Sequence, residues 1–160
     1  MSARTCGKCS MCCYLFDLPE LKKPKNKWCQ HCNPGKGCSI HNQERPEICG
    51  TYSCSWLLGA GALPDEWFPP KSKMIVNHVV VGDAAIIKIV LHHQYPNKWK
   101  EEPYHSMIMR MVKDGHVLVQ MGAQIVYTNC SQELLHEYVN TICVPVAHAL
   151  ATMHLNLANG

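Results

Sequence analysis

The residues best suited to chemistry are cysteines crowded near the N-terminus. Nine of the 11 cysteines fall in the first 54 residues: Cys6, Cys9, Cys12, Cys13, Cys29, Cys32, Cys38, Cys49 and Cys54. Thiolates are preferred ligands of zinc and other soft metals. Cys-x-x-Cys spacing lets two sulfurs from one tight turn reach the same ion. Three overlapping or separate pairs have this spacing, so the segment is predicted to bind metal.

The number of thiols predicts more than one metal ion. Adjacent side chains in extended backbone point to opposite sides, so Cys12 and Cys13 are not expected to serve one tetrahedral ion together. Nine thiols exceed the four ligands of one such ion and nearly match those of two. We therefore expect two zinc ions, with one thiol left to bridge or to stay free. An iron–sulfur cluster is the alternative, because Cys6, Cys9 and Cys12 share the C-x2-C-x2-C start of a ferredoxin motif.

The distribution of charge agrees with an anionic metal centre. Residues 1–54 hold eight Lys or Arg against four Asp or Glu, whereas the rest of the chain holds seven against eight. Two zinc ions bound by eight thiolates would have a net negative charge, and nearby cations would offset it and lower the pKa of the thiols.

Composition also sets the expected compartment. The most apolar stretch, IVNHVVVGDAAIIKIVL, is interrupted by His78, Asp83 and Lys88, so no membrane segment is predicted. The basic residues Arg4 and Lys8 are not followed by the apolar region of a secretory signal. We expect a cytoplasmic protein, and in a reducing compartment clustered cysteines are more often metal ligands or catalytic thiols than disulfides.

The sequence gives little indication of a reaction or of a nucleic-acid partner. It lacks a phosphate-binding loop, a dinucleotide-binding glycine motif and an H-E-x-x-H zinc-protease motif. Its net charge of +3 is low for a domain that binds nucleic acid through a basic face. The expected partner is therefore a protein or a small molecule.

Residues 6–54 are predicted to form loops and short turns, because KKPKNK, NPGKG and ERPE interrupt any hydrophobic periodicity. Something other than an apolar core is expected to hold them. The stretch LLGAGALPDEWFPPKSK, residues 57–73, is rich in glycine and proline and predicts a linker or an ordered loop.

The second half of the chain predicts an order of β-β-α-β-β followed by helices. Two β-branched runs flank Gly82 and Asp83, and two more apolar runs flank Gly122 and Ala123, which indicates two hairpins. Residues 103–115 have helical spacing, as do 134–142 and 146–157 on either side of Pro145. The predicted class is α+β: an irregular, metal-stabilised region over residues 1–70, then a small antiparallel sheet with helices over 71–160, packed as one unit.

Five cysteine-containing strings resemble a known family. TCGKCSMCC, WCQHC, KGCSI, ERPEIC and TYSCSWL are similar to the zinc- or iron-chelating cysteine-cluster domain, whose broader group includes flagellin lysine N-methylase. The resemblance covers about residues 5–70. It departs from the family in SIHNQERP, which has one residue more than the usual Ile-Tyr-x-x-Arg-Pro and His41 in place of Tyr, and at Gly50, where Arg often follows the cysteine.

The resemblance implies a function and one further site residue. It implies that the nine cysteines bind zinc or iron, and that Arg45 contacts the cluster sulfurs or an acidic ligand. It implies a structural or interaction module, or alternatively an iron–sulfur protein with redox or protein-lysine methyl-transfer activity.

Overall fold

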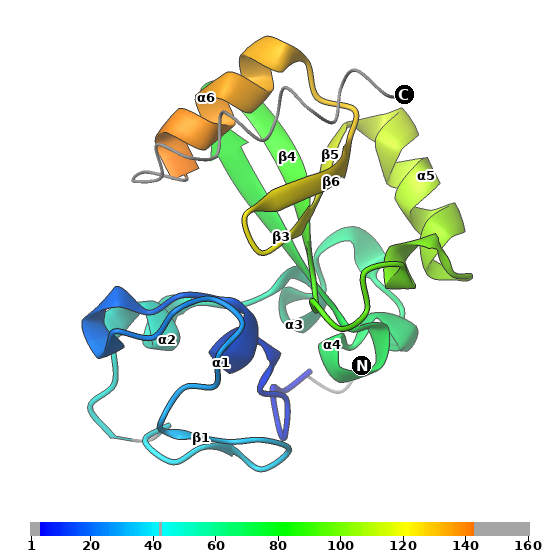
Figure 1. The fold of residues 1–160 in the computed structure, drawn as a ribbon. Helices are drawn as coiled ribbons and strands as arrows, with labels where there is room; N and C mark the ends of the chain where they lie inside the picture. Colours follow the sequence, from blue (N-terminus) through cyan, green and yellow to red (C-terminus); the bar gives the residue numbers. More distant parts are fainter. Residues whose placement is uncertain (1–3, 42, 143–160) are drawn as a thin grey trace.

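The computed structural model describes residues 4–41 and 43–142. A four-stranded sheet with helices on both faces occupies one part of the molecule, and the cysteine-rich segment lies at one end of it (Figure 1). The α+β class predicted from the sequence is confirmed.

Both predicted hairpins are present in the sheet, whose strand order is β3-β4-β5-β6. Strands β3 (Met74–Val81) and β4 (Ala84–Leu91) pair antiparallel along their whole length. Strands β5 (His116–Met121) and β6 (Gln124–Thr128) form the second antiparallel pair. The turn between β3 and β4 needs Gly82, whose φ of +56° is in the left-handed region that favours glycine.

The prediction of an antiparallel sheet is wrong for its central pair, because β4 and β5 run parallel. The connection between them includes a 3₁₀ turn, η4 (Lys98–Lys100), and the helix α5 (Tyr104–Asp114). Parallel neighbours require such a crossover, which returns the chain to the end of the sheet from which β4 began. The sheet is therefore mixed.

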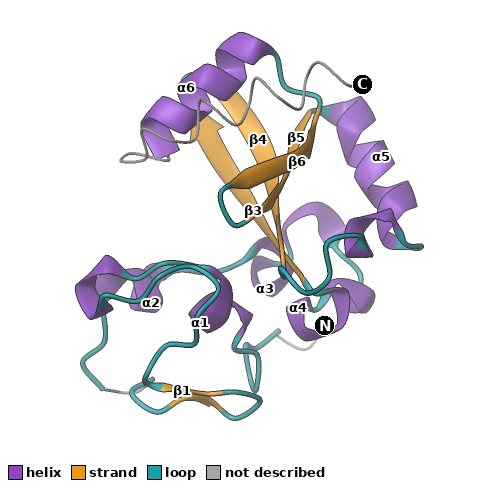
Figure 2. Ribbon diagram, viewed as in Figure 1, coloured by secondary structure: helices purple, strands orange, loops and turns teal. Residues whose placement is uncertain are grey.

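The two longer helices cover opposite faces of the sheet (Figure 2). Helix α5 inserts Ile108 into a core that includes Ile89 and Val117. Helix α6 (Gln132–Ile142) packs Tyr138 and Leu135 in the other core, with buried side chains from β3, β4 and β5. The predicted helix beyond Pro145 lies outside the described residues.

The glycine- and proline-rich stretch is an ordered part of the core and not a linker. It forms α3 (Ser55–Leu58), η2 (Ala60–Ala62), η3 (Asp65–Trp67) and α4 (Pro69–Ser72). Leu63 and Trp67 are only 1% and 2% exposed and pack in the same cluster as α5. The predicted boundary at residue 70 falls inside α4 and stays a prediction.

Apolar packing holds the first helix of the cysteine-rich segment, which the sequence analysis did not expect. Helix α1 (Met11–Leu15) buries Met11 and Leu15 against Ile75 of β3 and Val90 of β4. The hydroxyl of Tyr52 adds a hydrogen bond of 2.6 Å to Asn77 Oδ1.

The rest of that segment lacks a core of its own. It contains the turn η1 (Pro19–Leu21), the two-residue strands β1 (Cys32–Asn33) and β2 (Gly37–Cys38), and the helix α2 (Glu47–Thr51). No side chain in residues 30–41 or 43–50 is buried. Hydrophobic burial therefore contributes little to the positions of residues 30–41 and 43–50.

No helix within residues 4–41 and 43–142 combines the length and the apolar character needed to cross a membrane.

Candidate metal centre

Local hydrogen bonds form the turns that Cys-x-x-Cys spacing requires. The Cys9 N–H donates to the Cys6 carbonyl at 2.7 Å, and the Cys32 N–H donates to the Cys29 carbonyl at 2.9 Å. Each bond closes a turn that brings its two thiols to the same side of the chain.

Two longer-range hydrogen bonds connect these turns to α1. The Cys29 N–H donates to the Cys13 carbonyl at 3.1 Å, and the Gly35 N–H donates to Ser10 Oγ at 3.4 Å. The turn before α1, the helix itself and the β1–β2 hairpin are thereby brought together. Cysteines that are far apart in the sequence become neighbours.

Cys13 is the centre of the group. Its negative charge, when it is ionised, raises the pKa of thiols on both sides, namely Cys6, Cys9, Cys32 and Cys49. Such an effect requires proximity, because charge interactions fall with distance and with solvent screening.

The remaining cysteines join the same neighbourhood through their own interactions. Cys54 raises the pKa of Cys6 and Cys9, while Cys29 and Cys38 raise that of Cys49. Cys12 forms a side-chain hydrogen bond with Cys13. All nine predicted ligands therefore belong to one group of interacting thiols, which we call the cysteine cluster.

Without metal, the thiolate form is disfavoured at five cysteines whose pKa is raised, namely Cys6, Cys9, Cys13, Cys32 and Cys49. Burial is the largest cause that raises the pKa of Cys9 to about 11, and neighbouring thiols add to it. Burial, followed by the charge of Cys13, raises the pKa of Cys32 to about 12. A bound cation would reverse this preference, because a coordinating thiol is deprotonated by the charge of the metal.

The extended backbone assumed for Cys12 and Cys13 is wrong. Both residues lie in helix α1, where successive side chains are roughly 100° apart rather than on opposite sides. The hydrogen bond with the Cys12 thiol is the largest cause that raises the pKa of Cys13. Adjacency therefore gives no argument for two ions, and that prediction depends on the number of thiols alone.

Lys23 supplies a buried positive charge that sequence reasoning missed. The residue is 5% exposed, and its Nζ donates hydrogen bonds to the carbonyls of Tyr14 and Pro24 at 3.1 Å, and also to that of Phe16. Burial lowers its pKa, while Cys29 and Cys13 act in the opposite direction. The string KKPKNK resembles an ordinary solvated loop, so nothing in the sequence singles out this lysine.

Arg45 lies beside the cysteine cluster. Its charge lowers the pKa of Cys6 and of Cys49, although burial leaves the pKa of both thiols raised. Its Nε is 3.8 Å from the position that a Cβ at Gly50 would occupy. The cofactor-binding role of Arg45 stays a prediction.

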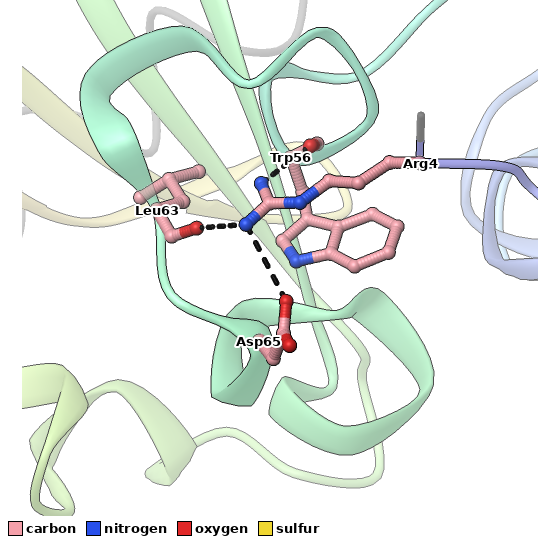
Figure 3. A network of polar contacts seen from close by, with 4 residues as sticks. All are labelled: Arg4, Trp56, Leu63 and Asp65. Carbon is pink, nitrogen blue, oxygen red and sulfur yellow. Dashed lines mark hydrogen bonds and ion pairs between the residues drawn. The ribbon is translucent and has the colours of Figure 1, made fainter. Parts of the chain in front are cut away.

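Arg4 joins the two ends of the cysteine-rich segment, a role that its position in the sequence does not indicate (Figure 3). Its Nη1 donates to the Trp56 carbonyl at 2.8 Å and its Nη2 to the Leu63 carbonyl at 2.7 Å. The guanidinium also lies 4.7 Å from the centre of the Trp56 ring and 3.4 Å from Asp65 Oδ1. Cys6 and Cys54 are thus anchored near each other through their sequence neighbours.

The types of ligand in the cluster suit a metal ion, but the present positions of the side chains do not. All ten cysteines in the described part of the chain are free thiols, and thiolates suit zinc, copper(I) or iron–sulfur centres. As the side chains stand, no three His, Cys, Asp or Glu residues among those described converge closely enough to hold an ion. Side-chain rotation would be needed to bring sulfurs to about 2.3 Å from one zinc.

A serine–histidine pair outside the cluster does not form a hydrolytic site. Ser55 Oγ lies 2.9 Å from His78 Nδ1, and His78 and Asp114 line a cavity of 210 Å³. Ser55 is only 2% exposed, and no ion pair joins His78 to Asp114 in the described structure. The pair contributes to packing between α3 and β3.

Cys130 is separate from the cysteine cluster. It is half-buried at the end of β6, and burial raises the pKa of its thiol. Cys143, the eleventh cysteine of the sequence, lies outside the described residues.

The fold and the site together define an α+β protein in which a nine-cysteine segment packs against the end of a mixed sheet. Comparison with protein-family models, with curated proteins and with solved structures gave no match. The resemblance to the cysteine-cluster family therefore stays a prediction that rests on the quoted motifs.

Proposed function

We propose that the cysteine cluster binds zinc, with two ions held by thiolates, and that residues 5–57 act as a metal-organised structural or interaction module in the cytoplasm. The proposal rests on one observation. Cys32, Cys38 and Cys49 lie in two-residue strands and a short helix where none of the described side chains is buried. Yet Cys32 and Cys49 interact with the Cys13 thiol of α1, and Cys38 interacts with Cys49.

Energetics support the proposal. Fixing each backbone residue costs about 1–2 kcal/mol of conformational entropy, and hydrophobic burial does not offset this cost in residues 30–41 and 43–50. In small cysteine-rich domains the free energy of metal binding to thiolates contributes directly to the stability of the fold. Helix α1 differs from these loops because it packs on Ile75 and Val90.

The charges around the cluster support it as well. Two zinc ions with eight thiolates have four net negative charges, which are costly in a partly buried site. Lys23 and Arg45 place positive charge beside Cys13, Cys6 and Cys49.

The test is metal analysis of protein purified without oxygen. A colourless protein with about two zinc ions per chain supports the proposal. A brown protein that absorbs at roughly 400 nm, with iron and sulfide in stoichiometric amounts, would replace it with the iron–sulfur alternative and reopen redox or methyl-transfer activity. A well-folded, reduced protein that contains neither metal would refute both.

A further inference from the structure

A group of stacked rings lies next to the cysteine cluster. The Tyr14 ring is 4.7 Å from that of Trp28 and 4.8 Å from that of His92, with only 17° between the planes in the second pair. The Tyr14 hydroxyl lies 2.9 Å from His93 Nδ1. Tyr14 therefore connects a loop of the cysteine-rich segment with the residues that follow β4.

The same group extends to Tyr95 and Lys73. The His92 and Tyr95 rings meet edge to face at 5.3 Å, and Lys73 Nζ lies 5.3 Å from the centre of the Tyr95 ring. The Gln94 N–H donates to His92 Nδ1 at 3.2 Å, and the His92 N–H donates to the Lys73 carbonyl at 2.9 Å. The first of these bonds orients the His92 ring, and the second, from the backbone N–H of His92, positions its main chain.

The group has a buried layer of rings and an exposed layer. Tyr14 and His92 are 8% and 9% exposed, whereas Trp28 and Tyr95 are 45% and 42% exposed. His93 is exposed as well. The exposed rings of Trp28, His93 and Tyr95 form what we call the aromatic surface. The buried rings of Tyr14 and His92 hold it in place. Such a surface is ready to contact a flat ligand with little further loss of side-chain entropy.

Lysines precede Trp28 in the sequence, and one lies against the Tyr95 ring. Lys22, Lys25 and Lys27 are exposed in the loop that leads to Trp28, where the acidic residues are Asp17 and Glu20. Lys73 lies at the Tyr95 end. The combination of exposed rings and cations complements a ligand that is both flat and anionic.

We propose that the aromatic surface binds single-stranded nucleic acid, with bases stacked on Trp28 and Tyr95 and phosphates near Lys27 and Lys73. Stacking on aromatic side chains is tolerant of sequence, and lysines along the strand neutralise its backbone. An acidic peptide would use the lysines but would not require two exposed rings. This inference does not depend on which metal the cysteine cluster binds.

This mode of binding differs from the basic face that the sequence analysis considered. A low net charge argues against broad electrostatic contact with duplex DNA, but stacking needs only a few well-placed rings. The rings come from residues 14, 28 and 92–95, so only the tertiary structure brings them together.

The test is fluorescence anisotropy of labelled oligo(dT) and oligo(U), each of about 12 nucleotides, titrated with the full chain as purified. We expect binding, and we expect Trp28→Ala and Tyr95→Ala each to weaken it on the order of ten-fold. Leu58→Ala, which changes a side chain that is 67% exposed and outside the aromatic surface, is the matched control and should bind as the unmodified protein does.

Two further variants separate stacking from charge and from misfolding. Trp28→Phe retains a ring and should restore most of the affinity that Trp28→Ala loses. Lys27→Gln should weaken binding to both oligonucleotides equally and reduce the slope of log K against log salt by about one.

Three outcomes would overturn the inference: no binding of either oligonucleotide at low salt, equal affinity of Trp28→Ala and Leu58→Ala, or equal affinity for a duplex of the same length that is independent of Trp28. Binding of an acidic peptide in place of the oligonucleotides would also overturn it, because the surface would then recognise protein.

Discussion

Lys23 and Cys13 favour each other's charged form. The ammonium lowers the pKa of the thiol, and the thiolate raises the pKa of the ammonium. The hydrogen bond with Cys12 and, after it, burial still leave the pKa of Cys13 raised, and burial leaves that of Lys23 lowered. Lys23 is held by three backbone carbonyls that belong to its own segment, and so its position does not depend on the thiol. The pair places a fixed cation next to the central sulfur of the cysteine cluster.

The first prediction follows from this pair. Lys23→Met should reduce the affinity for zinc by about 10–100-fold, the range seen when groups that support metal ligands are removed. Competition with a chromogenic zinc chelator measures the affinity directly. Lys22→Met, which changes the exposed neighbour, is the control and should retain the original affinity. Equal affinity in the two variants would show that Lys23 does not stabilise the bound thiolates.

The second prediction concerns which cysteines bind metal. Cys13→Ser should lower the metal content and solubility, because a central thiolate is lost and its neighbours are left without a shared cation. Cys130→Ser removes a half-buried thiol that packs in the core under α6 and not with the cluster, and should keep the full metal content. Elemental analysis of both variants after gel filtration provides the measurement. The same loss in both would contradict the assignment of ligands to residues 6–54.

Local patterns predicted most of the sheet, but not its topology. Gly82 and Gly122 stand between runs of β-branched residues, and both hairpins formed there. The direction of β5 relative to β4 depends on how α5 crosses the sheet, and neighbouring side chains do not encode that path. Residues 57–73 show the opposite case, because glycine and proline suggested a linker or an ordered loop, and did not indicate that Trp67 belongs to the core.

The cysteine cluster was predictable only in part. Spacing along the chain identified the thiols, because Cys-x-x-Cys turns are local. Lys23 and Arg4 were missed, because their roles depend on contacts that form only in the folded protein. The aromatic surface was missed for the same reason, since Tyr14 and His92 are far apart in the sequence and come into contact only in the folded chain.

The third prediction concerns Arg4. Arg4→Ala should lower the free energy of unfolding by about 2 kcal/mol, because two hydrogen bonds from a charged donor are lost and carbonyls are left unpaired. Asp65→Asn should cost only about 0–1 kcal/mol, because the Asp65 side chain is 81% exposed. Urea unfolding followed by fluorescence gives both values. If Asp65→Asn lowered the free energy of unfolding more than Arg4→Ala, the ion pair and not the bonds to the two carbonyls would be the important contact of Arg4.

The fourth prediction describes removal of the metal. A strong chelator should increase amide hydrogen exchange in the β1–β2 hairpin and in α2, where no described side chain of residues 30–41 or 43–50 is buried. Helix α1 should respond less, because Met11 and Leu15 pack on the sheet. Strands β3 to β6 should keep their protection. Unchanged exchange in the hairpin after confirmed loss of metal would mean that the metal does not organise these loops.

The last prediction is a pH dependence of stability that arises from His92. Burial is the largest cause that lowers its pKa below the ordinary value of 6.5, and the charges of His93 and Lys73 lower it further. The unfolded chain therefore binds more protons than the folded protein in the interval between the lowered pKa and 6.5. Stability should be greatest above this interval, fall as the pH decreases through it, and become level again below the lowered pKa.

A ring that does not titrate isolates this effect. His92→Phe keeps a flat ring against Tyr14 and removes the ionisable group, although it also removes the acceptor of the Gln94 N–H. The loss of that hydrogen bond should lower stability equally at every pH, whereas the decrease on acidification should become smaller. Urea unfolding of both proteins between pH 5 and 8 gives the difference, and protonation of metal-binding thiolates cancels because it acts on both. Parallel curves for the two proteins would show that burial of His92 does not oppose its protonation.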